Sequence, residues 1–100
     1  MNNDNVSQIM AVPTVQIDNE RVIATEWRFA PNAETGWHLH QHDYVVVPLL
    51  DGTLRIEGLD GAKTDVVLQR GVSYARSAGI EHNVVNANDF EFAFVEIELR

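Results

Sequence analysis

Residues 23–29 read IATEWRF, and their side chains alternate between the two faces of an extended chain. Trp27 and Phe29 fall on the apolar face, whereas Arg28 falls on the polar face between them. Residues 54–57, which read LRIE, show the same alternation. A period of two residues is typical of a strand that is buried on one side only. These stretches therefore predict half-buried β-strands.

Turn signals separate such stretches at short intervals along the chain. Asp51-Gly52, Asp60-Gly61 and Arg70-Gly71 are examples, and a spacing of roughly 8–12 residues is typical of sandwiches and barrels. No window of about a dozen residues carries the apolar stripe of a helix. We predict a single all-β, antiparallel domain over residues 13–100. Residues 1–12 are predicted to form a loose N-terminal tail, because their beginning is mostly polar.

The composition excludes several classes of function. With 100 residues, of which 45% are hydrophobic, the chain can bury one small core. A net charge of -8 argues against nucleic acid or a membrane as a partner. The absence of cysteine excludes disulfides and thiolate metal ligands. The longest apolar run, 45–50, is too short to span a bilayer and no signal peptide is visible, so we expect a cytoplasmic protein.

Two stretches are apolar on both faces. Residues 43–50 read DYVVVPLL, and Pro48 within them cannot donate to a β-ladder, which indicates an edge or a bulge. Near the C-terminus, Phe90, Phe92 and Phe94 share one face, and Val95, Ile97 and Leu99 share the other. Either a bulge resets the phase near Phe94, or a partner subunit covers the second face. We predict a homodimer.

Three of the four histidines lie within five residues, as His38, His40 and His42. Residues two apart on a strand share a face, so two of these imidazoles can converge on one metal ion. His82 lies about forty residues further along the chain and could supply a third ligand from another strand. A lone histidine in a strand is more often a surface or core residue, but the clustered spacing favours a metal site.

The residues around His82 resemble the second signature motif of the cupin family. Gly71, Ser77, Gly79, His82 and Asn86 keep every spacing of that motif. The one departure is Ser77, which stands where the family has proline. The resemblance implies the family's fold, a double-stranded β-helix or jelly-roll barrel.

The first signature motif of the family is present only in part. His38-Leu39-His40 matches its beginning and Gly52 matches its end. The family's glutamate is missing, and either Tyr44 or Val45 occupies the corresponding place. Alternation favours Tyr44 on the inner face, where a neutral phenol is a poor metal ligand but a good hydrogen-bond donor.

The resemblance implies a metal site and a substrate pocket. We expect His38, His40 and His82 to bind one divalent transition-metal ion, with His42 as the alternative fourth ligand. The metal is left open among iron, zinc, nickel and manganese. The predicted pocket residues are Tyr44, Asn86 and Arg76. Arg76 could hold a carboxylate, although a surface arginine beside a turn is the simpler interpretation.

The functional prediction follows from this site. We expect a metal-binding cupin that acts on a small organic molecule, in the manner of a metal-dependent oxygenase or isomerase. The alternative is a non-catalytic cupin that binds a small ligand or a metal as a sensor or auxiliary protein. The missing glutamate keeps both hypotheses open, and a purely structural domain is the third.

Overall fold

The computed structural model describes residues 9–100, and the regular structure in that range is entirely β. No helix in this range is long and apolar enough to cross a membrane. The strands are β1 (Val12–Asp18), β2 (Val22–Phe29), β3 (His38–Leu39), β4 (Tyr44–Pro48), β5 (Gly52–Gly58), β6 (Lys63–Leu68), β7 (Tyr74–Arg76), β8 (Glu81–Asn86) and β9 (Phe92–Leu99).

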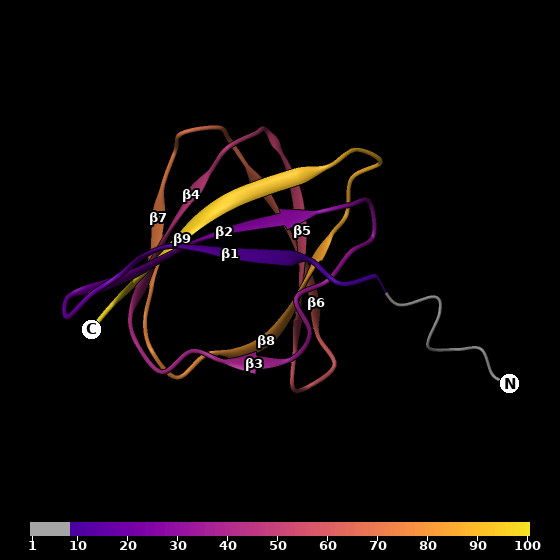
Figure 1. Ribbon diagram of the computed structural model, residues 1–100. Coiled ribbons are helices and arrows are strands. Elements are labelled where there is room, and N and C mark those ends of the chain that lie inside the picture. The colour runs from indigo at the N-terminus through magenta and orange to yellow at the C-terminus, as the bar shows by residue number, and fades with distance from the viewer. Residues whose placement is uncertain (1–8) are drawn as a thin grey trace, which may run out of the picture.

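The strands form two sheets that enclose one core (Figure 1). The larger sheet has the order β1-β2-β9-β4-β7, and the smaller has the order β3-β8-β5-β6. All paired strands are antiparallel. The predicted all-β jelly-roll fold is confirmed.

Alternation along the strands supplies the core from both sheets. Phe29 of β2 and Phe92 of β9 are opposite one another in the larger sheet and are fully buried. Leu54 of β5 and Val84 of β8 reach the same cluster from the smaller sheet. The core therefore lies between the sheets. A chain of this length can bury only one hydrophobic core of this kind.

The last strand contains no bulge, so a reset of its phase is ruled out. β9 pairs residue by residue with β2, from Phe92 opposite Phe29 to Leu99 opposite Val22. Its two faces are therefore both apolar in part, and Val95 and Ile97 lie on the outer face of the larger sheet, half-buried.

Pro48 marks neither an edge strand nor a bulge, but it lies at a local edge of the larger sheet. β4 lies inside the larger sheet, between β9 and β7, and its register with β9 is regular. The pairing with β7 covers only residues 44–46 of β4. Pro48 lies beyond the end of that short neighbour, so its missing N–H removes no ladder bond. Its carbonyl accepts a hydrogen bond from the Gly71 N–H at 2.9 Å.

The ordered domain begins before residue 13. The N–H of Ala11 donates to the carbonyl of Glu34, and the N–H of Glu34 donates to the carbonyl of Ile9. Ala11 is buried in the core cluster. The end of the predicted tail therefore belongs to the barrel, while residues 1–8 of that prediction lie outside the described residues.

Candidate metal centre and its pocket

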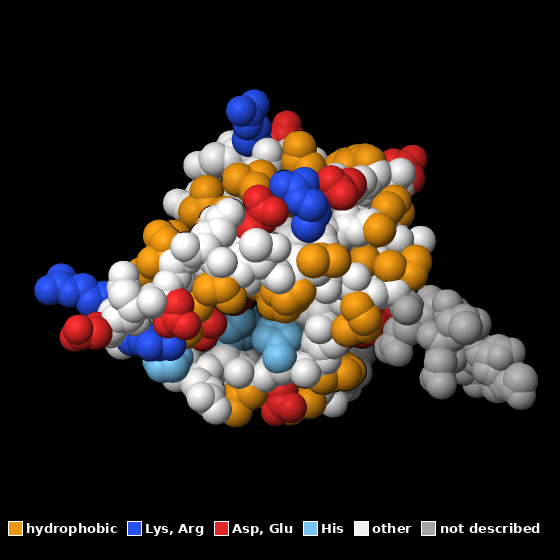
Figure 2. Space-filling view, in the orientation of Figure 1, with side chains coloured by type: hydrophobic (Ala, Val, Ile, Leu, Met, Phe, Trp, Pro, Cys, Tyr) orange, Lys and Arg blue, Asp and Glu red, His pale blue; other side chains and the backbone are white. Residues whose placement is uncertain are grey.

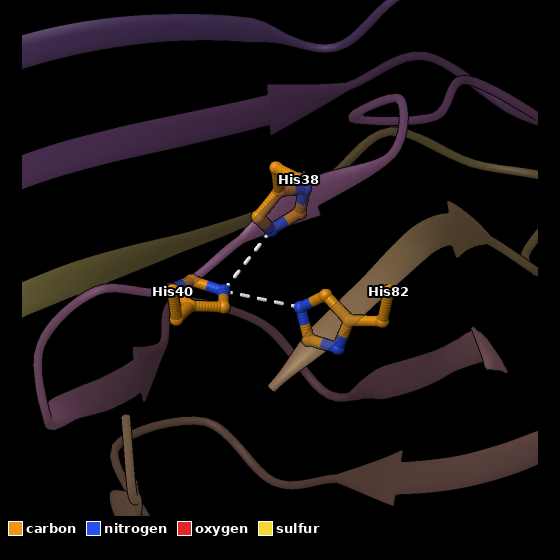
Figure 3. A group of neighbouring side chains, drawn as sticks. All are labelled: His38, His40 and His82. Carbon is orange, nitrogen blue, oxygen red and sulfur yellow. Dashed lines mark hydrogen bonds between the residues drawn. The ribbon is translucent and has the colours of Figure 1, made fainter. Parts of the chain in front are cut away.

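Three histidines meet at one end of the barrel because of the pairing of β3 with β8. His38 is the register partner of His82. His40 follows β3 directly, and its N–H donates to the carbonyl of Ile80, which continues the ladder. Residues 38 and 40 share a face of an extended chain. Figure 3 shows the three imidazoles turned toward one another from these neighbouring segments.

The distances between the imidazoles suit ligation of one ion. His40 Nε2 lies 3.0 Å from His38 Nε2 and 3.1 Å from His82 Nε2. One ligand atom from each of the three lies within 4.8 Å of the others. Nitrogens bound about 2.0–2.1 Å from a common ion at near-right angles lie about 3 Å apart. The arrangement fits a metal ion with three protein ligands.

Hydrogen bonding orients the ring of His38 for this role. Its Nδ1 lies 2.9 Å from the carbonyl oxygen of Gly36, which can only accept, so Nδ1 carries the proton. In the neutral ring, Nε2 then keeps its lone pair free. Such a second partner commonly fixes the tautomer of a metal-binding histidine.

The other two imidazoles are held neutral by their surroundings. His40 is 5% exposed and His82 is 7% exposed. Burial, followed by the proximity of His38, lowers the pKa of each ring to about 4. Neutral rings are what a metal site requires, because a proton and a metal ion compete for the same lone pair.

Cavities adjoin the histidines, and Figure 2 shows the imidazoles at an opening between the two sheets. A cavity of about 180 Å³ extends from His82 to Arg76. Its remaining lining is mostly apolar and consists of Tyr44, Leu54, Ile56, Val66, Tyr74 and Ile80. The Arg76 guanidinium lies over the Tyr74 ring, 4.5 Å from its centroid, and donates to the Ala75 carbonyl. The lining of the cavity therefore includes both a histidine of the candidate metal site and a cationic side chain.

Tyr44 faces inward, as alternation predicted, and Val45 faces outward. The Tyr44 ring stacks on the ring of His40, with centroids 3.9 Å apart and planes 18° apart. Burial, with the nearby carboxylate of Glu96 as the next cause, raises the pKa of the Tyr44 phenol to about 12. The phenol therefore stays protonated and can donate a hydrogen bond into the cavity.

The structure does not bring His42 together with the other three histidines. Its Nδ1 lies 3.6 Å from a carboxylate oxygen of Glu98, at the edge of the site. Asn86 does not line the cavity either, which corrects the prediction from the sequence. Its amide donates to the carbonyls of Phe29, Ala30 and Phe90, and its oxygen accepts from Asn88. Asn86 is fully buried because it ties these loops together.

Glu96 of β9 also lies at the site, although the sequence did not predict it there. One of its carboxylate oxygens lies 3.8 Å from His40 Nε2, and the residue is 8% exposed. Burial raises the pKa of Glu96 to about 7, the charge of Glu98 adds to this, and a hydrogen bond from Trp27 opposes it. Its position has one signal in the sequence: residue 96 continues the inward parity of Phe92 and Phe94.

Known proteins resemble this chain over most of its length. The beta-alanine degradation protein BauB of Pseudomonas aeruginosa is 60% identical over 90 residues, which are 90% of this chain and 94% of that protein. A cupin domain from Bordetella pertussis Tohama I superposes with a TM-score of 0.89 at 58% identity, covering 93% of this chain and 96% of that one. A cupin-2 domain protein from Shewanella frigidimarina has a TM-score of 0.64 at 26% identity, covering 97% and 90%.

The sequence profile described as "Cupin domain" matches residues 25–98. This span runs from β2 to β9, so it contains the three histidines, Tyr44 and Glu96. The profile, the paired sheets and the similarity to BauB agree, and the chain belongs to the cupin family.

Proposed function

We propose that this protein is a metal-dependent cupin enzyme that acts on a small organic molecule. His38, His40 and His82 hold one divalent transition-metal ion, which is iron, zinc, nickel or manganese. The observation that carries the proposal is the approach of the three imidazole Nε2 atoms to one another, at 3.0 and 3.1 Å. Three protein ligands leave positions on an ion open for water and substrate. When bound, such an ion would supply Lewis-acid chemistry, either by polarising a substrate oxygen or by activating water.

The cavity beside the site supports a small anionic substrate. Arg76 makes no ion pair with an acid in residues 9–100, and its guanidinium faces a cavity whose walls are mostly apolar. Arginine binds carboxylates through paired hydrogen bonds. A cavity of about 180 Å³ is small enough to suit a molecule of only a few carbons. The name of the relative BauB links that protein to the degradation of beta-alanine. We therefore propose that the substrate of this chain is a short carboxylate from the degradation of beta-alanine.

The experiment has a metal stage and a ligand stage. Protein purified without a His tag is stripped with a chelator and titrated with Fe²⁺, Zn²⁺, Ni²⁺ and Mn²⁺ by calorimetry. We expect about one equivalent per chain, as three converging ligands allow. Failure of every metal to bind would refute the proposal.

In the ligand stage, the metal-loaded protein is titrated with β-alanine and other three-carbon carboxylates. Arg76→Gln should weaken binding about 10-fold or more, because a charge-assisted hydrogen bond is lost. Arg70→Gln is the matched control, since Arg70 is an exposed arginine outside the cavity. Ligand binding without turnover would favour the non-catalytic sensor over the enzyme.

A further inference from the structure

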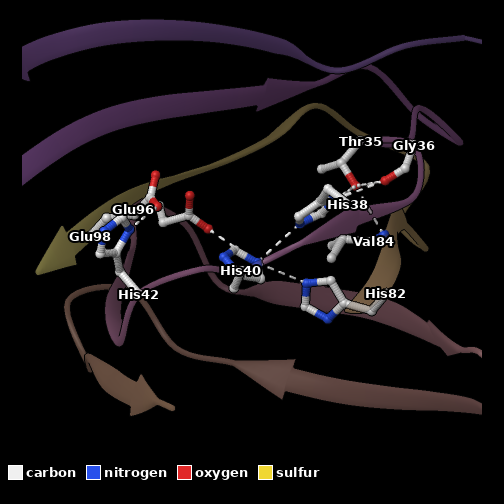
Figure 4. A network of polar contacts seen from close by, with 9 residues as sticks. All are labelled: Thr35, Gly36, His38, His40, His42, His82, Val84, Glu96 and Glu98. Atoms are coloured by element: carbon white, nitrogen blue, oxygen red, sulfur yellow. Dashed lines mark hydrogen bonds and ion pairs between the residues drawn. The ribbon is translucent and has the colours of Figure 1, made fainter. Parts of the chain in front are cut away.

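Glu96 is a buried acid with no strong base beside it. It lies on β9, opposite Thr25 of β2 and Val46 of β4, on the inner face of the larger sheet. Over residues 9–100, no lysine or arginine nitrogen comes within 4.0 Å of its carboxylate. The basic atom nearest to it in an ion-pair contact is His40 Nε2, at 3.8 Å. Figure 4 shows the Glu96 side chain directed at His40 from the side opposite His38 and His82.

Such a carboxylate is costly to ionise in the fold. Buried charges in proteins are paired or bind metals, because burial removes the hydration that stabilises the ion. The Trp27 indole, whose interaction with Glu96 lowers the pKa of that carboxyl group, is neutral and supplies no positive charge. His40 does not supply it either, because an imidazole that binds a metal ion is a neutral ligand. A metal ion held by the histidines would supply the positive charge that this carboxylate lacks.

The candidate metal site, in turn, lacks a negative charge among its three histidine ligands. Three neutral imidazoles leave the full charge of a divalent ion uncompensated in a mostly apolar pocket. The cupin glutamate that would compensate it is replaced by Tyr44, and a phenol that stays protonated brings no negative charge.

We infer that Glu96 supplies the negative charge of the metal site, from the opposite sheet and in place of the glutamate absent after His40. The inference rests on the proposed function, because it needs a metal ion to be bound. Glu96 offsets the charge of the ion and strengthens its binding. It is a positioning residue, since it acts through the ion and His40.

Glu96→Gln separates this role from a purely structural one. Glutamine has nearly the same shape and can still accept the hydrogen bond from Trp27, but it carries no charge. If Glu96 serves the metal, the metal-free variant should be at least as stable as the wild type at pH 8, while metal binding weakens. If Glu96 serves only the fold, the metal-free variant should lose stability and keep its metal affinity.

The experiment compares three chains, each stripped of metal and checked for folding by circular dichroism. Zn²⁺ and Co²⁺ affinities are measured by competition with a chelating dye at pH 8. For Glu96→Gln we expect affinity about 10–100-fold below the wild type, the range found when outer partners of a metal site are removed. The visible spectrum of bound Co²⁺ should change as well. Glu98→Gln is the control, because Glu98 lies on the same strand face but contacts His42, and we expect about the wild-type affinity.

The possible results distinguish failure of the inference about Glu96 from failure of the proposed metal-dependent function. If the wild type binds metal and Glu96→Gln binds it equally tightly, the inference is overturned and the proposed function stands. If Glu98→Gln weakens binding as much as Glu96→Gln, a general effect of acidic charge is responsible, and the inference is again overturned. If the wild type binds no metal, both are overturned. A Glu96→Asp variant that recovers part of the affinity supports the charge itself as the cause.

Discussion

The two sheets of the barrel contribute different kinds of groups to the site. The smaller sheet carries His38 and His82 as paired neighbours, with His40 at the end of the same short strand. The larger sheet brings Glu96 and Tyr44 to the histidines from the other side of the pocket. One sheet thus holds the candidate ligands, and the other holds the groups that surround them.

The two halves of the site are positioned by different kinds of interaction. The histidines are brought together by hydrogen-bonded pairing within a single sheet, which fixes their register. Glu96 and Tyr44 meet them only through packing of one sheet on the other, which depends on the core between. Changes in the smaller sheet should therefore remove the metal, whereas changes in the larger sheet should tune what the bound metal does.

The largest effect is expected from His82→Ala. Loss of one of three ligands should reduce bound metal from about one equivalent per chain to almost none. Elemental analysis of protein purified without a His tag measures this directly. His38→Ala and His40→Ala should behave in the same way, because all three belong to one cluster.

His42→Ala is the matched control for these variants. His42 is near in sequence, but it lies beside Glu98 rather than with the three other imidazoles. We expect it to keep its full metal equivalent. A full equivalent in His82→Ala would show that the ligands have been assigned wrongly, and loss of metal in His42→Ala would restore it as a fourth ligand.

The next effect is a dependence of stability on pH in the metal-free protein. Burial lowers the pKa of His40 and His82 to about 4 in the fold, against about 6.5 in an unfolded chain. Between these values the unfolded state binds more protons, so stability is complete above pH 6.5 and is lost as the pH falls toward 4. The loss is on the order of a few kcal/mol, since one pKa unit corresponds to about 1.4 kcal/mol.

Urea unfolding at pH 4.5 and 6.5 measures this loss of stability. The measurement is made in the Glu96→Gln variant as well as in the wild type, because Glu96 contributes a pH dependence of its own. The pKa of Glu96 is raised to about 7, so that group acts in the opposite direction and removes stability as the pH rises. In Glu96→Gln the opposing contribution of Glu96 is absent, and the contribution of His40 and His82 remains. Equal stability at both pH values would contradict the burial of neutral rings.

The sequence predicted the fold and the ligand half of the site because their signals are local. Alternation in residues 23–29 predicted a strand, and the His38-x-His40 spacing predicted two ligands on one face. The cupin resemblance around His82 added the third. Each signal depends on period and spacing, which the paired strands preserve.

The other half of the site could not be predicted in the same way. Glu96 lies in a strand that is apolar on both faces, where parity alone did not say which face meets the histidines. Asn86 was assigned to the pocket from its motif position, but backbone carbonyls take up its amide. Both cases depend on distances between sheets, which no single stretch of sequence records.

The outer face of the larger sheet provides the third prediction. Val45, Val95 and Ile97 lie together there, half-buried in the single chain, and β9 has no bulge that would turn them inward. We propose that a second copy of the chain covers this face. Ile97→Glu should weaken dimerisation about 10-fold or more, because a charge would be buried in an apolar interface.

Val67→Glu tests whether the effect belongs to that sheet. Val67 is an outward residue of β6 in the smaller sheet and is 77% exposed. Sedimentation velocity should show dimers for the wild type and for Val67→Glu, and dissociation for Ile97→Glu. A wild-type protein that is monomeric at micromolar concentration would contradict the homodimer.

The smallest effect is expected from Tyr44→Phe. Phenylalanine keeps the ring that stacks on His40 and removes only the hydroxyl group. Because burial keeps the Tyr44 phenol protonated, with its pKa raised to about 12, its oxygen should not be a metal ligand. Metal content should stay at the wild-type level, while binding of a three-carbon carboxylate should fall about 3–10-fold, as for the loss of one neutral hydrogen bond. Elemental analysis measures the metal content, and calorimetry with the metal-loaded protein measures the binding of the carboxylate. Loss of metal in Tyr44→Phe would show that the larger sheet supplies a ligand after all.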